Sequence, residues 1–255
     1  MTCTRRSCTG SAGALACKST KVATSPALLA GQHSRGYLPH IKGKGGTYFV
    51  TFRLAGTLPA YVLARYRAER DEIVKRALAM GGKLTPDEEN RLAELHSQQI
   101  ECYLDAGHGQ CWLKQPEIGE MVAKAIEHFA GERYDLHAWV VMPNHVHAVV
   151  TPRDGHILSD ILHTWKSYTA HEAQKVAQAS GLQIPKGEAF WQRESYDHLV
   201  RNEEDFARVC EYTIMNPVKA GLTEKPEDWP YSSASAQRAS HQDDAAGTAA
   251  LRAIE

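Results

Sequence analysis

The chain has 255 residues, of which 43% are apolar, and its formal net charge is −1. This composition excludes wholesale disorder, and the near-zero charge excludes binding of nucleic acid through bulk charge alone. No stretch reaches the roughly 18 apolar residues of a membrane span, and the apolar run after Arg5 and Arg6 is too short for a signal peptide. We therefore expect a cytoplasmic protein without membrane partners.

The cysteines form no CxxC pair or other zinc-type spacing, which favours reduced thiols over a metal site or a disulfide framework. They are Cys3, Cys8, Cys17, Cys102, Cys111 and Cys210.

Charge is unevenly distributed along the chain. Residues 1–60 contain eight Lys or Arg and no acidic residue, whereas residues 61–120 contain eight basic and eleven acidic residues. Residues 1–34 are rich in Ser, Thr, Ala and Gly, and we predict a disordered basic tail there. A basic arm on a near-neutral body suits contact with phosphate, so Arg35, Lys42 and Lys44 are candidate DNA contacts.

The predicted folded part, residues 35–235, begins with a strand over 46–56, which is β-rich and bounded by glycines. A helical pattern follows over 60–105 and is broken at Gly81-Gly82. Thr85, with acids in the turn after it, predicts the cap of the second segment. We interpret residues 60–112 as an inserted helical hairpin.

Apolar residues from Ile118 to Phe129 recur at helical spacing behind Pro116. Strands are predicted over 133–142 and 145–152, joined by a hairpin turn at Pro143-Asn144. A second amphipathic helix is predicted over 157–178.

Residues 195–201 read as a last short strand, after which Asn202 caps a helix that is predicted to end near Asn216-Pro217. The element order predicts an α+β fold of the ferredoxin-like split βαβ type: an antiparallel sheet with helices on one face, plus the inserted hairpin. Residues 236–255 are predicted to be a flexible tail.

His145 and His147 are two residues apart at the start of a strand, so their side chains point to the same face. Two converging neutral imidazoles can bind a divalent metal and leave positions open for a substrate oxygen. Taken alone, an HxH pair is also compatible with ordinary polar residues on a strand.

Tyr212 and Asn216 are four residues apart at the end of a predicted helix and therefore share a face. The phenol could attack a phosphodiester, and the amide oxygen of Asn216 could be a third, neutral metal ligand. Nucleophile and metal would then be fixed on one rigid turn, which is what phosphoryl transfer chiefly requires. Each residue alone is equally compatible with packing or with helix termination.

Five motifs in this order give the chain a family resemblance: VVMPNHVHAVV, WKSYTA, FWQRESYDHLVR, EYTIMNPVKAGL and WPYSS. The chain resembles the REP-associated tyrosine transposases, a branch of the HUH single-tyrosine transposases, from about residue 36 to 235 excluding most of 60–112. The long insertion and the N-terminal extension depart from the compact members of that family.

The resemblance implies that His145, His147 and Asn216 bind a divalent metal, Mg²⁺ or Mn²⁺, and that Tyr212 is the nucleophile. It also implies cleavage and rejoining of single-stranded DNA at a hairpin, a repetitive extragenic palindrome or similar element, through a 5′-phosphotyrosine link. Such a protein would act at the nucleoid as a monomer or homodimer.

Alternatives remain both for the nucleophilic residue and for the function of the protein. Tyr196 is a rival nucleophile, with His198 beside it as a conceivable base. If Tyr212 is the nucleophile, three further residues are candidate phosphate contacts or structural groups: His198, Arg201 and Lys166. Lys166 is expected on the exposed side of its helix.

A domesticated hairpin-binding protein that does not cleave would need none of the four site residues. A metal-dependent hydrolase that uses water predicts a carboxylate near the histidine pair, and the motif itself contains none.

Overall fold

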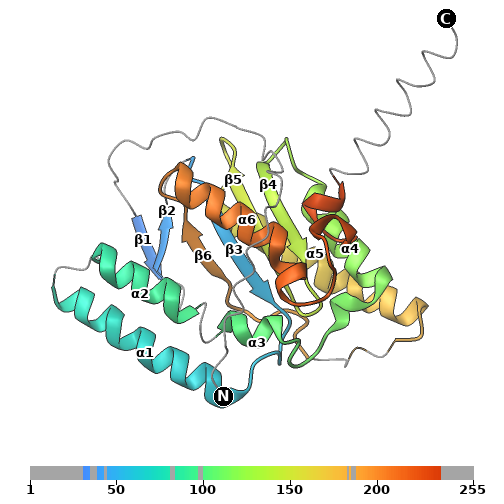
Figure 1. Cartoon of the computed structure of the whole chain (residues 1–255), viewed down its shortest axis with the longest axis horizontal. Helices are drawn as coiled ribbons and strands as arrows, with labels where there is room; N and C mark the ends of the chain where they lie inside the picture. Colours follow the sequence, from blue (N-terminus) through green and yellow to red (C-terminus); the bar gives the residue numbers. More distant parts are fainter. Residues whose placement is uncertain are drawn as a thin grey trace, which may run out of the picture.

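The computed structural model describes residues 31–34, 39–42, 45–80, 84–96, 100–182, 184 and 188–236. Its centre is a four-stranded antiparallel sheet in the order β4-β5-β3-β6 (Figure 1). The strands are β3 (Tyr48–Arg53), β4 (Tyr134–Val141), β5 (His145–Pro152) and β6 (Tyr196–Leu199). The predicted α+β class and the predicted order of elements are confirmed.

One face of the sheet is covered by α4 (Pro116–Glu127) and α5 (Leu158–Ala179). Strand side chains such as Val50 and Val146 pack there against Ile118 of α4 and Trp165 of α5, and all four are buried. The apolar positions of both helices recur at helical spacing, so each buries one stripe against the sheet. This face holds the largest apolar cluster of the described residues.

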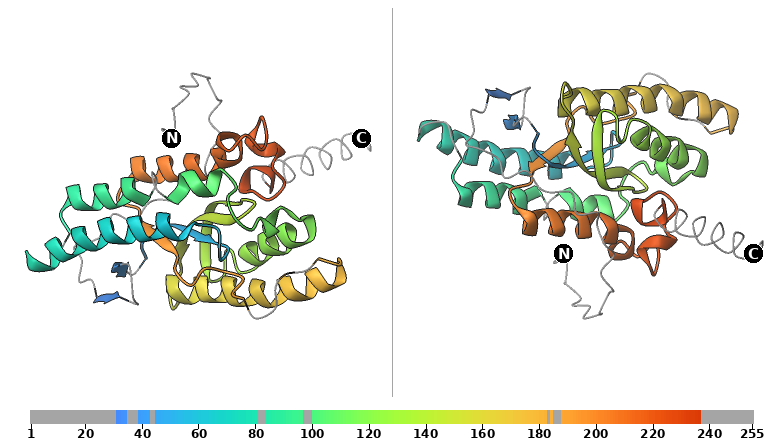
Figure 2. Two further views of the ribbon diagram at one scale, coloured as in Figure 1. Left: turned by 90° about the horizontal axis from the view of Figure 1, so that it is seen from below. Right: turned by 90° about the horizontal axis from the view of Figure 1, so that it is seen from above.

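The opposite face is covered by α6 (Glu203–Lys219), so the prediction of helices on one face only is wrong. Figure 2 shows the sheet between α6 on one side and α4 with α5 on the other. Phe49 and Val149 point to this second face and pack with Val209 of α6. The physical reason is that the second face of β3 and β5 also carries large apolar side chains, Phe49 and Val149, which need a cover layer.

The predicted helices of the insertion are present as α1 (Ala60–Ala79), α2 (Pro86–His96) and the one-turn α3 (Cys102–Asp105). They share a separate apolar cluster that includes Val62, Leu95 and Leu104. Thr85 caps α2 as predicted: its hydroxyl accepts from Glu88 N at 3.3 Å, while Glu88 Oε2 accepts from Thr85 N at 2.8 Å.

Helix α6 begins as predicted, because the Asn202 side chain accepts a hydrogen bond from Asp205 N at 2.8 Å. The predicted end at Asn216-Pro217 is wrong, since the helix continues through Pro217 to Lys219. Proline removes only its own N–H donor, and the bond from Ala220 N to Asn216 O at 2.9 Å still closes the helix. In the last turn of a helix this loss is tolerated.

Two further features border the sheet. β1 (Gly31–Ser34) pairs antiparallel with β2 (Pro39–Lys42), so the predicted disordered tail cannot extend to residue 34. Residues 1–30 and 237–255, which carry the two tail predictions, lie outside the described residues.

The WPYSS motif follows the turn η3 (Pro226–Asp228) and runs along the edge strand β4. Trp229 Nε1 donates to Val141 O at 2.9 Å, and Tyr231 O accepts from Val141 N at 2.8 Å. The motif therefore covers an otherwise open edge of the sheet. Among the described helices, none has the length and apolar character that a membrane span requires.

Candidate active site

His145 and His147 lie on β5, and both side chains project to the face covered by α6. Their Nε2 atoms are 3.0 Å apart, and neither residue is exposed to solvent. The predicted convergence of the two imidazoles is confirmed. Two buried ring nitrogens that face each other this closely, with no charge between them, define a point at which a cation can be bound.

The other ring nitrogen of each histidine is bonded by a neighbouring side chain. His147 Nδ1 is 2.8 Å from Thr51 Oγ1, and these two residues are directly opposite each other in the β3–β5 register. His145 Nδ1 is 2.7 Å from Asn144 Oδ1. Such second contacts fix the orientation of metal-binding imidazoles.

The bonding of Asn144 also determines the proton position on His145. Asn144 Nδ2 donates to the backbone carbonyl of His108 at 3.0 Å, so Asn144 Oδ1 is turned toward His145 and can only accept. In this arrangement His145 Nδ1 is the donor to Asn144 Oδ1, so Nε2, which lies 3.0 Å from His147 Nε2, is the acceptor nitrogen of the ring. The sequence pattern assigns Asn144 only to a turn and gives no sign of this role.

Helix α6 brings Tyr212 and Asn216 to the same place, as their four-residue spacing predicts. The Tyr212 ring lies 5.4 Å from the His147 ring and 5.8 Å from the Phe49 ring, between centroids. Asn216 is fully buried, and its amide lies near enough to Asp105 and Tyr212 to lower the pKa of both, but among the described residues neither its Oδ1 nor its Nδ2 has a hydrogen bond of normal geometry. Burying an amide without hydrogen bonds costs free energy, and binding of a cation to its oxygen would offset that cost.

Two carboxylates that the sequence pattern does not reveal come from the insertion. Asp105 Oδ1 on α3 is 3.7 Å from His145 Nε2, and Glu101 lies four residues earlier, largely buried. Ligand atoms of Asp105, His145 and His147 all lie within 4.8 Å of one another. A carboxylate is therefore available near the histidines, although their own motif contains none.

These carboxylates make the site electronegative. Burial, and then the charge of Glu101, raise the pKa of Asp105 to about 7, although Lys219 and Asn216 act in the opposite direction. Burial, followed by the charges of Glu101 and Asp105, raises the pKa of Tyr212 far above its ordinary value. A divalent cation near the histidines would offset both effects, since an opposite charge favours phenolate and carboxylate.

The residues present fit a divalent metal. The two imidazoles present Nε2 atoms 3.0 Å apart, and Asn216 and Asp105 each have buried polar atoms with no hydrogen bond to the described residues. Mixed nitrogen and oxygen donors of this kind suit first-row divalent ions and Mg²⁺.

The rival tyrosine, Tyr196, lies on β6 opposite Thr51 and packs edge-on against Phe49, with ring centroids 6.4 Å apart. Burial, then the charge of Glu101, raise its pKa as well. His198, its suggested base, is engaged elsewhere, because its Nε2 is 2.8 Å from Asp205 Oδ2. Tyr212 has the direct ring contact with the histidine pair.

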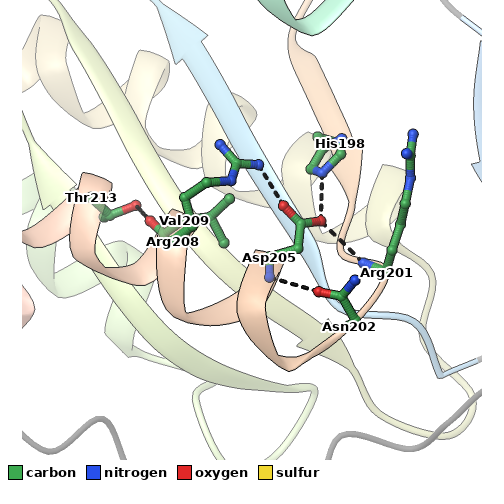
Figure 3. A network of polar contacts seen from close by, with 7 residues as sticks. All are labelled: His198, Arg201, Asn202, Asp205, Arg208, Val209 and Thr213. Carbon is green, nitrogen blue, oxygen red and sulfur yellow. Dashed lines mark hydrogen bonds and ion pairs between the residues drawn. The ribbon is translucent and has the colours of Figure 1, made fainter. Parts of the chain in front are cut away.

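Asp205 is the centre of a polar network at the start of α6 (Figure 3). Its carboxylate accepts from Arg201 N at 3.1 Å and pairs with His198 and Arg208. Burial would raise the pKa of Asp205, but the hydrogen bonds from His198 and Arg208 outweigh it and lower the pKa overall. His198 therefore has a structural partner.

The other proposed DNA contacts are placed differently. Lys166 is not on an exposed side of α5: it is half-buried, and its Nζ donates to the carbonyls of Gln192 at 2.7 Å and Arg193 at 2.9 Å. The side chains of Arg35, Lys42 and Lys44 lie outside the described residues.

Part of the chain is similar to a known protein family. Residues 112–215 match the family described as Transposase IS200 like, a segment that includes His145, His147 and Tyr212. The match lies in the part of the chain that carries β4, β5, α5, β6 and most of α6.

The relatives are REP-associated tyrosine transposases. The Escherichia coli K12 protein of that name is 30% identical over 99 residues, which are 39% of this chain and 53% of that protein. A relative from Haemophilus influenzae, named for the same kind of transposase, is 29% identical over 120 residues, 46% of this chain and 66% of its own. The matches thus span about half to two thirds of these relatives.

Among solved structures, a REP-associated tyrosine transposase bound to a REP hairpin matches with 21% identity and a TM-score of 0.40. The match covers 85% of this chain and 87% of that one. A likeness at this score establishes neither the detailed fold nor the function of this chain.

Proposed function

We propose that the chain is a metal-dependent single-stranded DNA endonuclease and transposase, which cleaves and rejoins DNA at hairpin elements with Tyr212 as nucleophile. The observation that carries the proposal is the contact of the Tyr212 ring with His147, whose Nε2 faces that of His145 at 3.0 Å. Nucleophile and metal ligands are therefore fixed on two packed elements, α6 and β5, before substrate arrives.

In the proposed reaction the Tyr212 oxygen bonds to the scissile phosphorus, and the bond from phosphorus to the 3′-oxygen breaks. The products are a 5′-phosphotyrosine and a free 3′-hydroxyl, and a second 3′-hydroxyl reverses the step during rejoining. Glu101, whose charge acts on Tyr212, is the carboxylate available to accept the phenolic proton. A bound Mg²⁺ or Mn²⁺ would supply Lewis-acid stabilisation of the phosphate charge.

Access to this site requires a movement. His145, His147 and Asn216 are completely buried, and the Tyr212 oxygen is also shielded from solvent. The covering groups include Asp105 of α3 and Lys219, whose Nζ lies 4.6 Å from the centre of the Tyr212 ring. Substrate DNA must displace part of this cover to present a phosphate to Tyr212.

The test is to incubate the full chain with single-stranded hairpin oligonucleotides from its own genome, with Mg²⁺, with Mn²⁺ and with chelator. We expect a metal-dependent covalent protein–DNA adduct on a denaturing gel, together with a released fragment ending in a 3′-hydroxyl. The electronegative site also favours a second candidate, a hydrolase that uses water, which would give metal-dependent cleavage without an adduct. Tight binding with no cleavage under any condition would instead identify a hairpin-binding protein that has lost catalysis.

A further inference from the structure

The helical insertion places a carboxylate at the histidine pair. Asp105 Oδ1 lies 3.7 Å from His145 Nε2, and the two Nε2 atoms lie 3.0 Å from each other. Ligands at about 2.0–2.2 Å from a common ion lie roughly 3 to 4 Å apart, which is the spacing observed here. The three side chains could therefore share one ion with little adjustment.

Two side chains beside the histidine pair, Asp105 and Asn216, have buried polar atoms without a hydrogen bond in the described part of the chain. Asp105 Oδ1 is buried without a hydrogen bond to the described residues, and so are both polar atoms of the Asn216 side chain. Asn216 is completely buried, so bulk solvent does not reach its amide. Buried oxygens without partners are uncommon in native structures, and a cation accounts for several of them at once.

The position of Asp105 is held by contacts between the insertion and the core. The carbonyl of His108 accepts from Asn144 Nδ2 at 3.0 Å, and Leu113 N donates to Pro143 O at 3.1 Å. Gly109 lies so close to the segment after β3 that a Cβ there would be 2.5 Å from the Cα of Thr57. The segment after α3 is thus fixed to the same turn that precedes the two histidines.

From these contacts we infer that Asp105 is a metal ligand, supplied by the insertion and acting together with His145, His147 and Asn216. This inference rests on the proposed metal site of the transposase. It gives the insertion a defined part in catalysis: it adds a charged oxygen donor to a set that is otherwise neutral. Two oxygen and two nitrogen donors favour Mg²⁺ or Mn²⁺ more than an all-nitrogen set does.

The test measures metal binding by the full chain without DNA. Mn²⁺ would be titrated into the parent, Asp105→Asn and Asp105→Glu, and free Mn²⁺ followed by electron paramagnetic resonance. The matched control is Asp87→Asn, an exposed acid on α2 of the same insertion. We expect Asp105→Asn to raise the Kd for Mn²⁺ by at least about tenfold, Asp105→Glu to retain most of the affinity, and Asp87→Asn to match the parent.

Hydrogen exchange gives a second readout that also checks folding. Mn²⁺ should slow amide exchange over residues 100–106 in the parent and in Asp87→Asn, because ligation ties α3 to β5. Asp105→Asn should lose this protection while the sheet exchanges as in the parent. A metal-binding effect without protection of 100–106 would contradict ligation by Asp105.

A His145→Ala variant separates the two claims. If Asp105→Asn binds Mn²⁺ like the parent while His145→Ala does not, the metal site stands and Asp105 is not a ligand. If neither substitution changes Mn²⁺ binding, the metal site fails, and the proposed function fails with it.

Discussion

At the scale of single residues, the candidate site depends on supporting side chains whose role the motifs do not show. His145 and His147 are prepared to bind a metal only because Asn144 and Thr51 engage their second nitrogens. A sequence pattern can place two histidines on one face of a strand, because that follows from strand geometry. It cannot show which residue lies opposite His147 until the register of β3 against β5 is known.

The contribution of Thr51 can be tested with Thr51→Val, which keeps the shape and removes the hydroxyl. His147 then loses its oriented tautomer, and we expect the Mn²⁺ Kd to rise about 10- to 100-fold with little change in fold. Calorimetric titration with Mn²⁺ measures this effect. Thr47→Val is the control, because Thr47 lies just before β3 and its hydroxyl pairs with Thr151, away from the histidines. Equal affinity in the two variants would show that Thr51 has no role in metal binding.

Asp205 should stabilise the fold in a way that depends on pH. Its pKa in the folded state is below the unfolded value, so its contribution is complete above about pH 4 and is lost as the pH falls through the folded pKa. We expect Asp205→Asn to lower the free energy of unfolding by about 1–3 kcal/mol at pH 7, with the difference shrinking below pH 4.

Urea unfolding at pH 7, 5 and 3.5 measures the difference between Asp205→Asn and the parent. Asp160→Asn is the matched control, since Asp160 is an exposed acid in the first turn of α5. A loss in Asp205→Asn that is the same at all three pH values would contradict a role for the carboxylate charge.

At the scale of elements, periodicity and capping residues predicted the four strands of the central sheet and its covering helices, but not the hairpin of β1 and β2. Two predictions were wrong for physical reasons: α6 passes through Pro217, and it covers the second face of the sheet. Both errors come from local rules applied to a helix whose place is decided by tertiary packing. The position of α6 on the second face follows from the proposed site, because Tyr212 can reach the histidines only from the face to which they point.

The carboxylates of α3 illustrate what an element-level prediction leaves out. The helical pattern predicted over residues 60–105 contains α1, α2 and α3, yet nothing in it indicates that Asp105 lies beside His145. That proximity depends on how the insertion packs on the turn before β5, through contacts such as that of His108 with Asn144.

Gly119 in α4 is a position where close packing and helix propensity predict opposite effects of a substitution by alanine. Alanine at position 119 would favour the helix by about 0.8–1 kcal/mol over glycine on propensity alone. Its Cβ, however, would lie 2.7 Å from Leu113 O and 2.9 Å from a ring carbon of Tyr231 in the WPYSS motif.

We therefore expect Gly119→Ala to lower the melting temperature. Glu120→Ala, at an exposed position of the same helix, should change it little. Thermal unfolding monitored by circular dichroism measures the melting temperature of each variant. A Gly119→Ala protein that is more stable than the parent would show that α4 is not closely packed there.

At the scale of the whole molecule, the net charge of −1 is unevenly distributed, because the first 60 residues are basic and contain no acidic residue. If Arg35, Lys42 and Lys44 bind phosphates, their joint replacement by alanine should weaken binding to hairpin and unrelated single strands alike. Each phosphate of a single strand that the variant no longer neutralises should reduce the slope of log K against log salt by about 0.7. Fluorescence anisotropy at several salt concentrations measures both quantities, and an unchanged affinity with an unchanged slope would exclude this segment as a phosphate-binding arm.

The central claim is that Tyr212 forms the covalent link to DNA. Its most direct test compares Tyr212→Phe with Tyr196→Phe on a 5′-labelled and a 3′-labelled hairpin, with Mn²⁺ present. Each substitution removes one phenolic oxygen and keeps the ring that packs against Phe49. We expect Tyr212→Phe to bind the hairpin like the parent and to give neither adduct nor cleavage, while Tyr196→Phe retains both. An adduct that persists in Tyr212→Phe and disappears in Tyr196→Phe would contradict the account.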